Sequence, residues 1–528
     1  MKLSPTAWLI QQLENSPNKW FQHSPEEWKT FPSPQRSNVF NAGDLEVWGR
    51  FLESANAPEA VLENWRRLSH PEAVCVVAGQ QAGLMGGPLY TAWKSLSALQ
   101  WARRLERAWK KPVIPVFWVA SDDHDFEEVS TVNAVVEGKL LSRSWPELNT
   151  QPGHSVGQLP VDASYFADTE FNYSPVPTNN QTLEQHFLEQ YFALFGELGI
   201  VPISPRLGFL RKASSRLLLN ELGNGGRGTQ LLVENFSKLE EEGLDGAGIQ
   251  RKGTEINFFW HRAEGRCRLE RVGESDEIQA ISPLSGKTVW RGSRIDLEGI
   301  VHQQPELFSP NAAMRPLVQD FALPTAAFIG GPSELIYHGQ IAPLYALHNV
   351  HRPLLVPRTS LTLVPPRVSR YLRKMELNTT DVLNQDPDEV QLAISRKTDT
   401  ESALQRLDFQ ALALQNELDQ MQSLLGESRD RRLEEYLEKI RRYVKRGTEK
   451  IQRRMVETLS HRAEVQGVQL EEVMAYLKPA GAPQERVLTC NPTLPELLGE
   501  RAMQRLNAAV DFCDWRSHLV VEINQLPE

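Results

Sequence analysis

Two neighbouring stretches decide the expected fold: VCVVAGQQAGLMGGPLYTAWKS at 74–95 and VIPVFWVASDDHDFEE at 113–128. Each stretch begins with an apolar, β-branched run that is typical of a buried strand. The residues between the two runs, 89–109, have a helical pattern. The order of strand, glycine-rich turn, helix, strand and charged cluster indicates a parallel α/β sheet. Both polar clusters then lie at the carboxyl ends of neighbouring strands, where such sheets bind ligands.

The glycine-rich turn predicts an anion-binding site. Its glycines allow backbone conformations and a close ligand approach that a Cβ would obstruct. Pro88 suits the first turn of the following helix, whose N–H groups and dipole attract an anion. Lys94 lies about 9 Å further along that helix, and its side chain leans back towards the turn. A tight turn with a capped helix explains the pattern equally well. The candidate residues are Gly79, Gln80, Gln81, Gly83, Gly86, Gly87, Tyr90 and Lys94.

Five carboxylates surround one histidine directly after the second strand. The cluster consists of Asp122, Asp123, His124, Asp125, Glu127 and Glu128. A nearby carboxylate orients an imidazole and raises its pKa. We therefore expect His124, with Asp123 or Asp125, to act as a general base or to bind a substrate amine. A metal–carboxylate site and a solvated acidic loop are the alternatives.

A third cluster follows between 307 and 358. Arg315, Gln319 and Asp320 fit one face of a helix. TAAFIGG at 325–331 repeats the pattern of strand, glycine–proline turn and helix, and LLVPR at 354–358 ends a further strand. The candidate pocket residues from this part of the chain are Arg315, Gln319, Asp320, Gly331, Glu334, Tyr337 and Arg358. Arg315 and Arg358 suit a substrate carboxylate or salt bridges to the acidic cluster.

Residues 222–306 predict an inserted α+β element. SPLSGKT at 282–288 resembles the end of a phosphate-binding loop, but Ile281 stands where the first glycine of that motif belongs. The segment is therefore not expected to bind phosphate.

Residues 386–478 change to a heptad pattern that predicts an antiparallel coiled-coil hairpin. GESRD at 426–430 separates the two stripes. The first stripe consists of Leu404, Leu407, Ala411, Leu414, Leu418, Met421 and Leu425, and the second of Leu433, Leu437, Ile440, Val444, Gly447, Ile451 and Met455. Exposed Leu424, Tyr436 and Tyr443 favour a homodimer through this hairpin. PAGAPQERVLTC at 479–490 is interpreted as the return to the core, with Gln484, Glu485 and Arg486 ahead of a strand.

The expected fold class is α/β, with a Rossmann-like parallel-sheet core, inserted α+β elements and a C-terminal antiparallel helical hairpin. The expected parts are the first part of the core at 1–221, the insertion at 222–306, the second part of the core at 307–385, the coiled coil at 386–478 and the return to the core at 479–528.

Composition limits the class of protein. The chain has 528 residues, of which 41% are hydrophobic, and a formal net charge of −10. The acidic balance argues against nucleic acid as a partner. Four separated cysteines without a CxxC motif indicate a reducing cytoplasm and no structural zinc. No segment has the length and apolarity of a membrane span or a signal peptide, so no membrane partner is expected.

Several motifs together resemble one family, the bacillithiol biosynthesis cysteine-adding enzymes, also called bacillithiol synthases or cysteine ligases. The motifs are GQQAGL, GGPLYTAWK, PVFWVASDDHDFEEV, the stretch 307–345, LLVPRTSLTLV at 354–364 and PQERVLTCNPTL at 483–494. The resemblance spans nearly the whole chain. Ala78, Met85-Gly86 and Ser121-Asp122 depart locally from the family pattern.

The resemblance implies a ligase that adds L-cysteine to the amine of glucosaminyl-malate, the last step of bacillithiol synthesis. It also implies a projecting coiled coil and a homodimer. A free carboxylate must be activated, so ATP is the expected cosubstrate, and cysteine and glucosaminyl-malate are the expected small-molecule partners. Two alternatives stay open at this point. One is a metal-dependent nucleotidyl transferase or hydrolase, and the other is a nucleotide-binding coiled-coil scaffold without catalysis.

Overall fold

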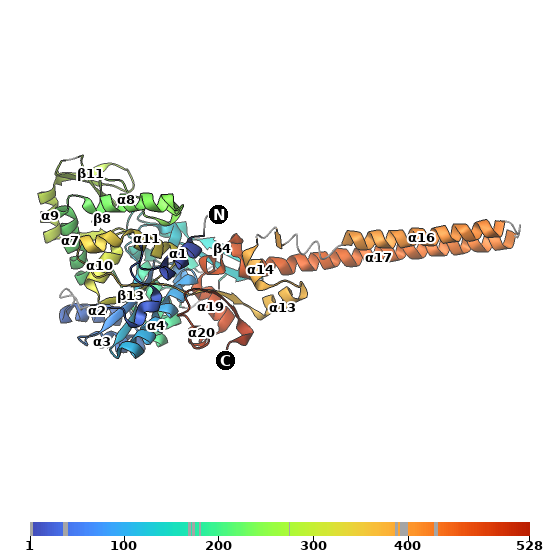
Figure 1. Cartoon of the computed structure of the whole chain (residues 1–528), viewed down its shortest axis with the longest axis horizontal. Helices are drawn as coiled ribbons and strands as arrows, with labels where there is room; N and C mark the ends of the chain where they lie inside the picture. Colours follow the sequence, from blue (N-terminus) through green and yellow to red (C-terminus); the bar gives the residue numbers. More distant parts are fainter. Residues whose placement is uncertain are drawn as a thin grey trace. The chain divides into compact units, whose positions relative to one another are not determined.

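The computed structural model describes residues 4–34, 41–166, 170–171, 175–178, 181–273, 275–385, 389–390, 400–426 and 431–527. It divides into two compact units (Figure 1). The first contains residues up to Val136, Leu141–Leu363 and Gln484–Glu528, and the second contains Glu137–Leu140 and Val364–Pro483. The predicted boundary at 386 lies outside the described residues.

A five-stranded parallel sheet forms the centre of the first unit. Its strands, in spatial order, are β14 (Leu354–Pro357), β13 (Thr325–Gly330), β1 (Val74–Gln80), β2 (Val113–Val119) and β7 (Val201–Ile203). The strand order reverses direction between β1 and β13, and such a switch point is where open α/β sheets bind ligands. The predicted Rossmann-like core is therefore confirmed.

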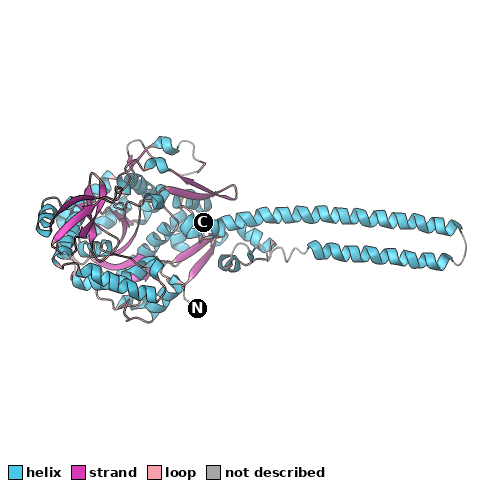
Figure 2. Ribbon diagram, turned by 90° about the horizontal axis from the view of Figure 1, so that it is seen from above, coloured by secondary structure: helices cyan, strands magenta, loops and turns pink. Residues whose placement is uncertain are grey.

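Helices enclose this sheet (Figure 2). The long helix α4 (Tyr90–Trp109) connects β1 to β2 and packs against β1, β2 and β13. Trp93 of α4 and Trp118 of β2 are almost completely buried. The remaining α-helices of the first unit are α1 (Pro5–Glu14), α2 (Ala42–Ser54), α3 (Glu59–Arg67), α5 (Phe126–Val129), α6 (Leu183–Phe195), α7 (Gly208–Gly223), α8 (Arg227–Glu241), α9 (Arg294–Gln303), α10 (Arg315–Ala322), α11 (Pro332–Gln340), α12 (Ala342–Leu347), α18 (Gln484–Val487), α19 (Cys490–Leu498) and α20 (Ala502–Ala509).

The predicted insertion contributes four of the five strands of a second, antiparallel sheet, and the fifth, β12 (Phe308–Pro310), follows it directly. The strands of this sheet, in spatial order, are β11 (Thr288–Ser293), β10 (Glu277–Ile281), β9 (Gly265–Arg271), β8 (Glu255–Arg262) and β12. SPLSGKT forms the turn between β10 and β11, in which Gly286 N donates to Ser282 O. Because no helix begins there, the segment lacks the geometry of a phosphate-binding loop, as its sequence indicated.

The shorter strands are β3 (Thr131–Val136), β4 (Lys139–Ser144), β5 (Pro160–Val161), β6 (Gln181–Thr182), β15 (Ser360–Val364) and β16 (His518–Glu522). The strand predicted after Gln484, Glu485 and Arg486 is wrong. Gln484–Val487 form α18, and Cys490 already begins α19. Pro88 also precedes α4 rather than starting it, because Leu89 is the N-cap.

The second unit contains the coiled coil. Helices α16 (Thr400–Gly426) and α17 (Arg431–Leu477) lie side by side in both views (Figures 1 and 2), and α13 (Pro366–Lys374) packs on the end of α17. This unit also contains α14 (Thr379–Asn384). The hairpin is confirmed, but residues 427–430 of the predicted turn lie outside the described residues.

The predicted seam is only partly correct. Leu407, Ala411 and Leu418 are half-buried, whereas Leu414 and Met421 are 51% and 53% exposed. On the return helix, Ile440 and Ile451 are also exposed. Contacts between α16 and α17 therefore cover only part of the apolar surface that the heptads provide. The side chains of Leu404, Leu425, Leu433 and Met455 lie outside the described residues.

Candidate functional site

A cavity of about 630 Å³ lies at the carboxyl ends of the parallel strands. This volume is in the usual range for small-molecule sites. The candidate residues that line it are Gly79, Gln80, Gln81, Tyr90, Lys94, Asp123, His124, Arg315, Gly331, Glu334, Tyr337 and Arg358. The candidate residues that do not line it are Gly83, Gly86, Gly87, Asp125, Gln319 and Asp320. The three polar clusters of the sequence therefore meet in one place.

Lys94 forms a buried ion pair with Glu334. Its Nζ lies 2.6 Å from Glu334 Oε2 and also donates to Gly79 O and Gln80 Oε1, both at 2.9 Å. Burial alone would raise the pKa of Glu334, but the Lys94 cation lowers it overall. All three ammonium hydrogens thus have acceptors within the protein. We infer that Lys94 fixes Glu334 rather than reaching back to an anion.

The turn before α4 differs from the predicted anion site. Gly86 and Gly87 have φ of 85° and 70°, which explains glycine at both positions. However, Leu89 N donates to Leu488 O and Thr91 N to Pro88 O, each at 2.8 Å. The expectation of free N–H groups is therefore wrong at these two residues.

The acidic cluster divides by role. Asp122 is buried and lies 2.6 Å from Arg211 Nη2, and this cation helps to keep the pKa of Asp122 low despite burial. Asp125 is the N-cap of α5, where it accepts from Glu128 N. Only Asp123, His124 and Glu128 offer their side chains to the cavity without such a structural role.

His124 lies between a carboxylate and an arginine. Its Nδ1 is 3.5 Å from Asp123 Oδ1 and 3.2 Å from Arg266 Nη1. Burial would raise the pKa of Asp123, but hydrogen bonding to His124 and the Arg266 charge lower it overall. The ring also packs edge-on against Phe259, with 5.9 Å between the ring centroids. These contacts restrain the imidazole at the cavity.

Gln81 connects the glycine-rich turn to the acidic cluster. Its Nε2 donates to Asp123 Oδ2 at 3.1 Å and to Glu128 Oε2 at 2.6 Å. Its Oε1 accepts from Gln80 Nε2, which also donates to the Tyr90 hydroxyl. Burial raises the pKa of Glu128. The two glutamines therefore act as hydrogen-bonding links that position carboxylates.

Arg315 lines the cavity, and residues outside the cavity fix its side chain by hydrogen bonds. Its Nη1 donates to Gln319 Oε1 at 3.2 Å, and Gln319 Nε2 donates to Asp320 Oδ1 at 2.8 Å. Tyr345 donates to the other oxygen of Asp320. Burial raises the pKa of Asp320 to about 6. Gln319 and Asp320 thus support Arg315 instead of contacting a ligand.

Sequence reasoning missed five polar residues that line the cavity: Arg251, Arg266, Asn311, Ser333 and Arg486. Arg266 is part of GRCRLER, which has the alternation of an ordinary strand, and Arg251 belongs to no motif. Asn311 and Arg486 lie in motifs that carry the family resemblance, but nothing in the sequence gave them a role. Only their tertiary positions bring them to the site.

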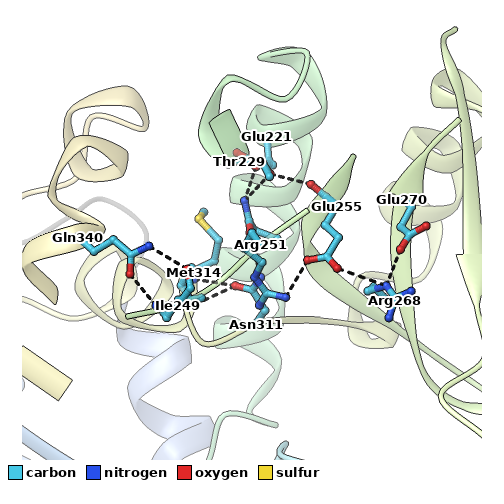
Figure 3. Close-up of polar contacts among 12 residues, drawn as sticks. Glu221, Thr229, Ile249, Arg251, Glu255, Arg268, Glu270, Asn311, Met314 and Gln340 are labelled. Atoms are coloured by element: carbon cyan, nitrogen blue, oxygen red, sulfur yellow. Dashed lines mark hydrogen bonds and ion pairs between the residues drawn. The ribbon is translucent and has the colours of Figure 1, made fainter. Parts of the chain in front are cut away.

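The insertion positions two of these residues through a buried polar network (Figure 3). Asn257 Nδ2 donates to Glu221 Oε1 and Thr229 Oγ1, and Asn257 Oδ1 accepts from Asn311 Nδ2 at 3.0 Å. Arg251 Nη1 donates to Glu255 Oε2 at 3.2 Å. Asn311 and Arg251 therefore have fixed positions.

Comparison with known proteins gives matches along almost the whole chain. Residues 18–359 match the family model described as "Bacillithiol biosynthesis BshC, N-terminal Rossmann-like domain". Residues 361–523 match "Bacillithiol biosynthesis BshC, C-terminal coiled-coil domain".

Three similar proteins carry the name "Putative cysteine ligase BshC". The protein of Salinibacter ruber is 28% identical over 88% of this chain and 87% of its own length. The protein of Prosthecochloris aestuarii is 28% identical over 92% of this chain and 90% of its own length. That of Chloroherpeton thalassium is 29% identical over 59% of this chain, and the match spans only 57% of the length of that relative.

Proposed function

This chain belongs to the bacillithiol biosynthesis BshC family, and on that premise we propose that it is a cysteine ligase. In the proposed reaction the carboxyl group of L-cysteine forms an amide with the amine of glucosaminyl-malate, as the last step of bacillithiol synthesis. The observation that carries the proposal is one cavity that contains both a restrained imidazole–carboxylate pair and several cations. The imidazole–carboxylate pair can accept a proton from the substrate amine. The cations can bind the substrate carboxylates.

His124 is the proposed base. The sugar amine must lose a proton before it attacks the activated carboxyl. Because an arginine only donates, the 3.2 Å contact with Arg266 Nη1 makes Nδ1 the unprotonated nitrogen, and Nδ1 is the atom that would accept the amine proton. Arg266 keeps Asp123 ionised, and Asp123 in turn stabilises the imidazolium that forms.

ATP is the proposed activating cosubstrate, and it would supply the activation of the cysteine carboxyl. Its phosphates would need cations with unused donors. Arg251 Nε is buried and has no hydrogen-bond partner among the described residues, so this side chain fits that requirement. Arg251 would hold the phosphates.

Neither alternative function has comparable support. Within the described ranges, no group of three or more His, Cys, Asp or Glu side chains could hold a metal ion.

No helix in the described parts of the chain is long and apolar enough to cross a membrane. A cytoplasmic location stays part of the proposal.

The purified protein should join cysteine to glucosaminyl-malate when ATP is supplied, with the product detected by mass spectrometry. Omission of each reactant in turn tests the role of each. In cells that lack this protein, bacillithiol should disappear and glucosaminyl-malate should accumulate. Unchanged thiol content in those cells would contradict the proposal.

We also propose a homodimer formed through the coiled coil. Tyr436 and Tyr443 are 69% and 68% exposed, and they lie seven residues apart on one face of α17. Replacing both with lysine should convert a dimer into a monomer at micromolar concentration, as measured by light scattering. Glutamine at Glu438 and Lys445, on the opposite face, is the control and should leave the dimer intact. A monomeric wild-type protein would refute this assembly.

A further inference from the structure

Most cations of the cavity already have a carboxylate partner. Lys94 pairs with Glu334 and Arg358 with Glu485, at 2.6 and 2.7 Å. Arg251 and Arg266 lie 3.2 and 3.7 Å from Glu255 and Asp123, respectively. The other two cations that line the cavity are Arg315 and Arg486.

Arg315 and Arg486 differ from these four. Arg315 is bound by the Gln319 amide and by the Tyr337 hydroxyl, which are both uncharged. Arg486 is exposed, and within the described ranges it has neither a hydrogen bond nor an ion pair. Two guanidinium groups therefore face the cavity without a carboxylate bound to them.

The backbone around Arg486 is fixed even though its side chain is free. Gln484 is fully buried, accepts from Leu363 N and donates to Leu363 O, both at 2.9 Å. Glu485 holds Arg358 with both oxygens and also accepts from Leu361 N. These contacts fix Gln484 and Glu485, so the backbone that carries Arg486 has a fixed position at the cavity.

Further contacts hold the segment after Arg486. Leu488 O accepts from Leu89 N, and Thr489 exchanges hydrogen bonds with the backbone of Asn133. The charges of Arg358 and Arg486 both act on the Tyr90 hydroxyl, and those of Arg358 and Arg315 both act on Lys94. Arg486 therefore lies near Tyr90 and Arg315 near Lys94, and Lys94 Nζ is 5.4 Å from the centroid of the Tyr90 ring.

We propose that Arg486, together with Arg315, recognises a dicarboxylate group of the substrate, and that Arg486 determines specificity for it. The inference rests on the proposed function, in which the malate part of the acyl acceptor supplies two carboxylates. Two unpaired guanidinium groups match two carboxylates in number and charge. The planar fork of arginine also suits bidentate binding of a carboxylate.

Isothermal calorimetry of the full chain with L-malate tests this recognition directly. Arg486→Gln should weaken malate binding by about 10- to 100-fold, the usual effect of losing a hydrogen bond to a charged group. Arg486→Lys should recover part of the affinity, because it keeps the charge but not the fork. Arg501→Gln removes an exposed arginine outside the cavity lining and should bind like the wild type.

Inorganic phosphate serves as the second probe, since a phosphate is the other anion that the free arginine could bind. Its affinity should be the same in the wild type and in Arg486→Gln. A loss of phosphate binding with unchanged malate binding would overturn the proposal. Unchanged binding of both probes would overturn it as well.

Kinetics separate this inference from the ligase proposal. In Arg486→Gln, KM for glucosaminyl-malate should rise about 10- to 100-fold, while kcat and KM for cysteine stay near the wild-type values. A protein that binds malate through Arg486 but ligates nothing would refute the ligase and retain the recognition. Ligation with an unchanged KM for glucosaminyl-malate would refute the recognition and retain the ligase.

Discussion

Replacement of His124 by alanine should lower kcat/KM for cysteine ligation by about 100-fold or more, the usual contribution of a positioned general base. The folded structure should survive, because the imidazole is partly exposed at the cavity and contributes no core packing. Steady-state kinetics and circular dichroism measure the two effects. The control is His302→Ala, which removes an exposed histidine of α9 and should leave both unchanged.

Asp123→Asn belongs to the same test. It keeps the shape of the side chain but removes the charge that stabilises the imidazolium, so kcat should fall while substrate binding changes less. If His124→Ala ligated cysteine at the wild-type rate, His124 would have no role as the base.

Glu485→Ala should lower the free energy of unfolding of the first unit by about 3–5 kcal/mol, the usual cost of breaking a buried ion pair. The Arg358 and Glu485 side chains are only 4% and 6% exposed, so the remaining arginine would be a buried, unpaired charge. Urea denaturation followed by tryptophan fluorescence measures the loss. Glu500→Ala, at an exposed position, should change stability by no more than about 0.5 kcal/mol.

The effect of Glu485 should depend on pH. Burial alone would raise the pKa of Glu485, but the Arg358 ion pair lowers it below 4.5 overall. A carboxyl with a lowered pKa contributes its full stabilisation above its unfolded pKa and loses it as pH falls through the folded pKa. The stability difference between the wild type and Glu485→Ala should therefore be largest near neutral pH and shrink below about pH 4.5. A difference that stays constant down to pH 3 would show that packing, and not the ion pair, explains the loss.

The sequence predicted the fold well where local patterns determine structure. The runs that form β1 and β2 are apolar and β-branched. In a parallel sheet the carboxyl ends of neighbouring strands lie at the same edge, and this does not depend on the rest of the chain. This rule is why His124, Gln81 and Glu334 were expected in one place. The helix pattern of α16 and α17 was equally readable.

The ion pairs of the site could not be predicted from the sequence, because partners that are far apart in the chain leave no local pattern. Lys94 has the spacing of an anion-binding lysine, and only the tertiary structure brings Glu334 to it. Arg266 has the alternation of any strand residue, and its contact with His124 depends on how the second sheet packs. The apolar run at 487–490 suggested a strand, yet its first residue completes α18 and its last begins α19.

The double hydrogen bond between Gln484 and the backbone of Leu363 joins the two points where the chain leaves and re-enters the first unit. The two ends of residues 364–483 are thereby held together by the first unit itself. The entropy cost of closing a loop grows only with the logarithm of its length. Adding or removing whole heptads therefore changes the free energy of holding the two ends together only slightly. The length of the hairpin is therefore not constrained by the first unit, which should keep its fold when whole heptads are added to or removed from the hairpin.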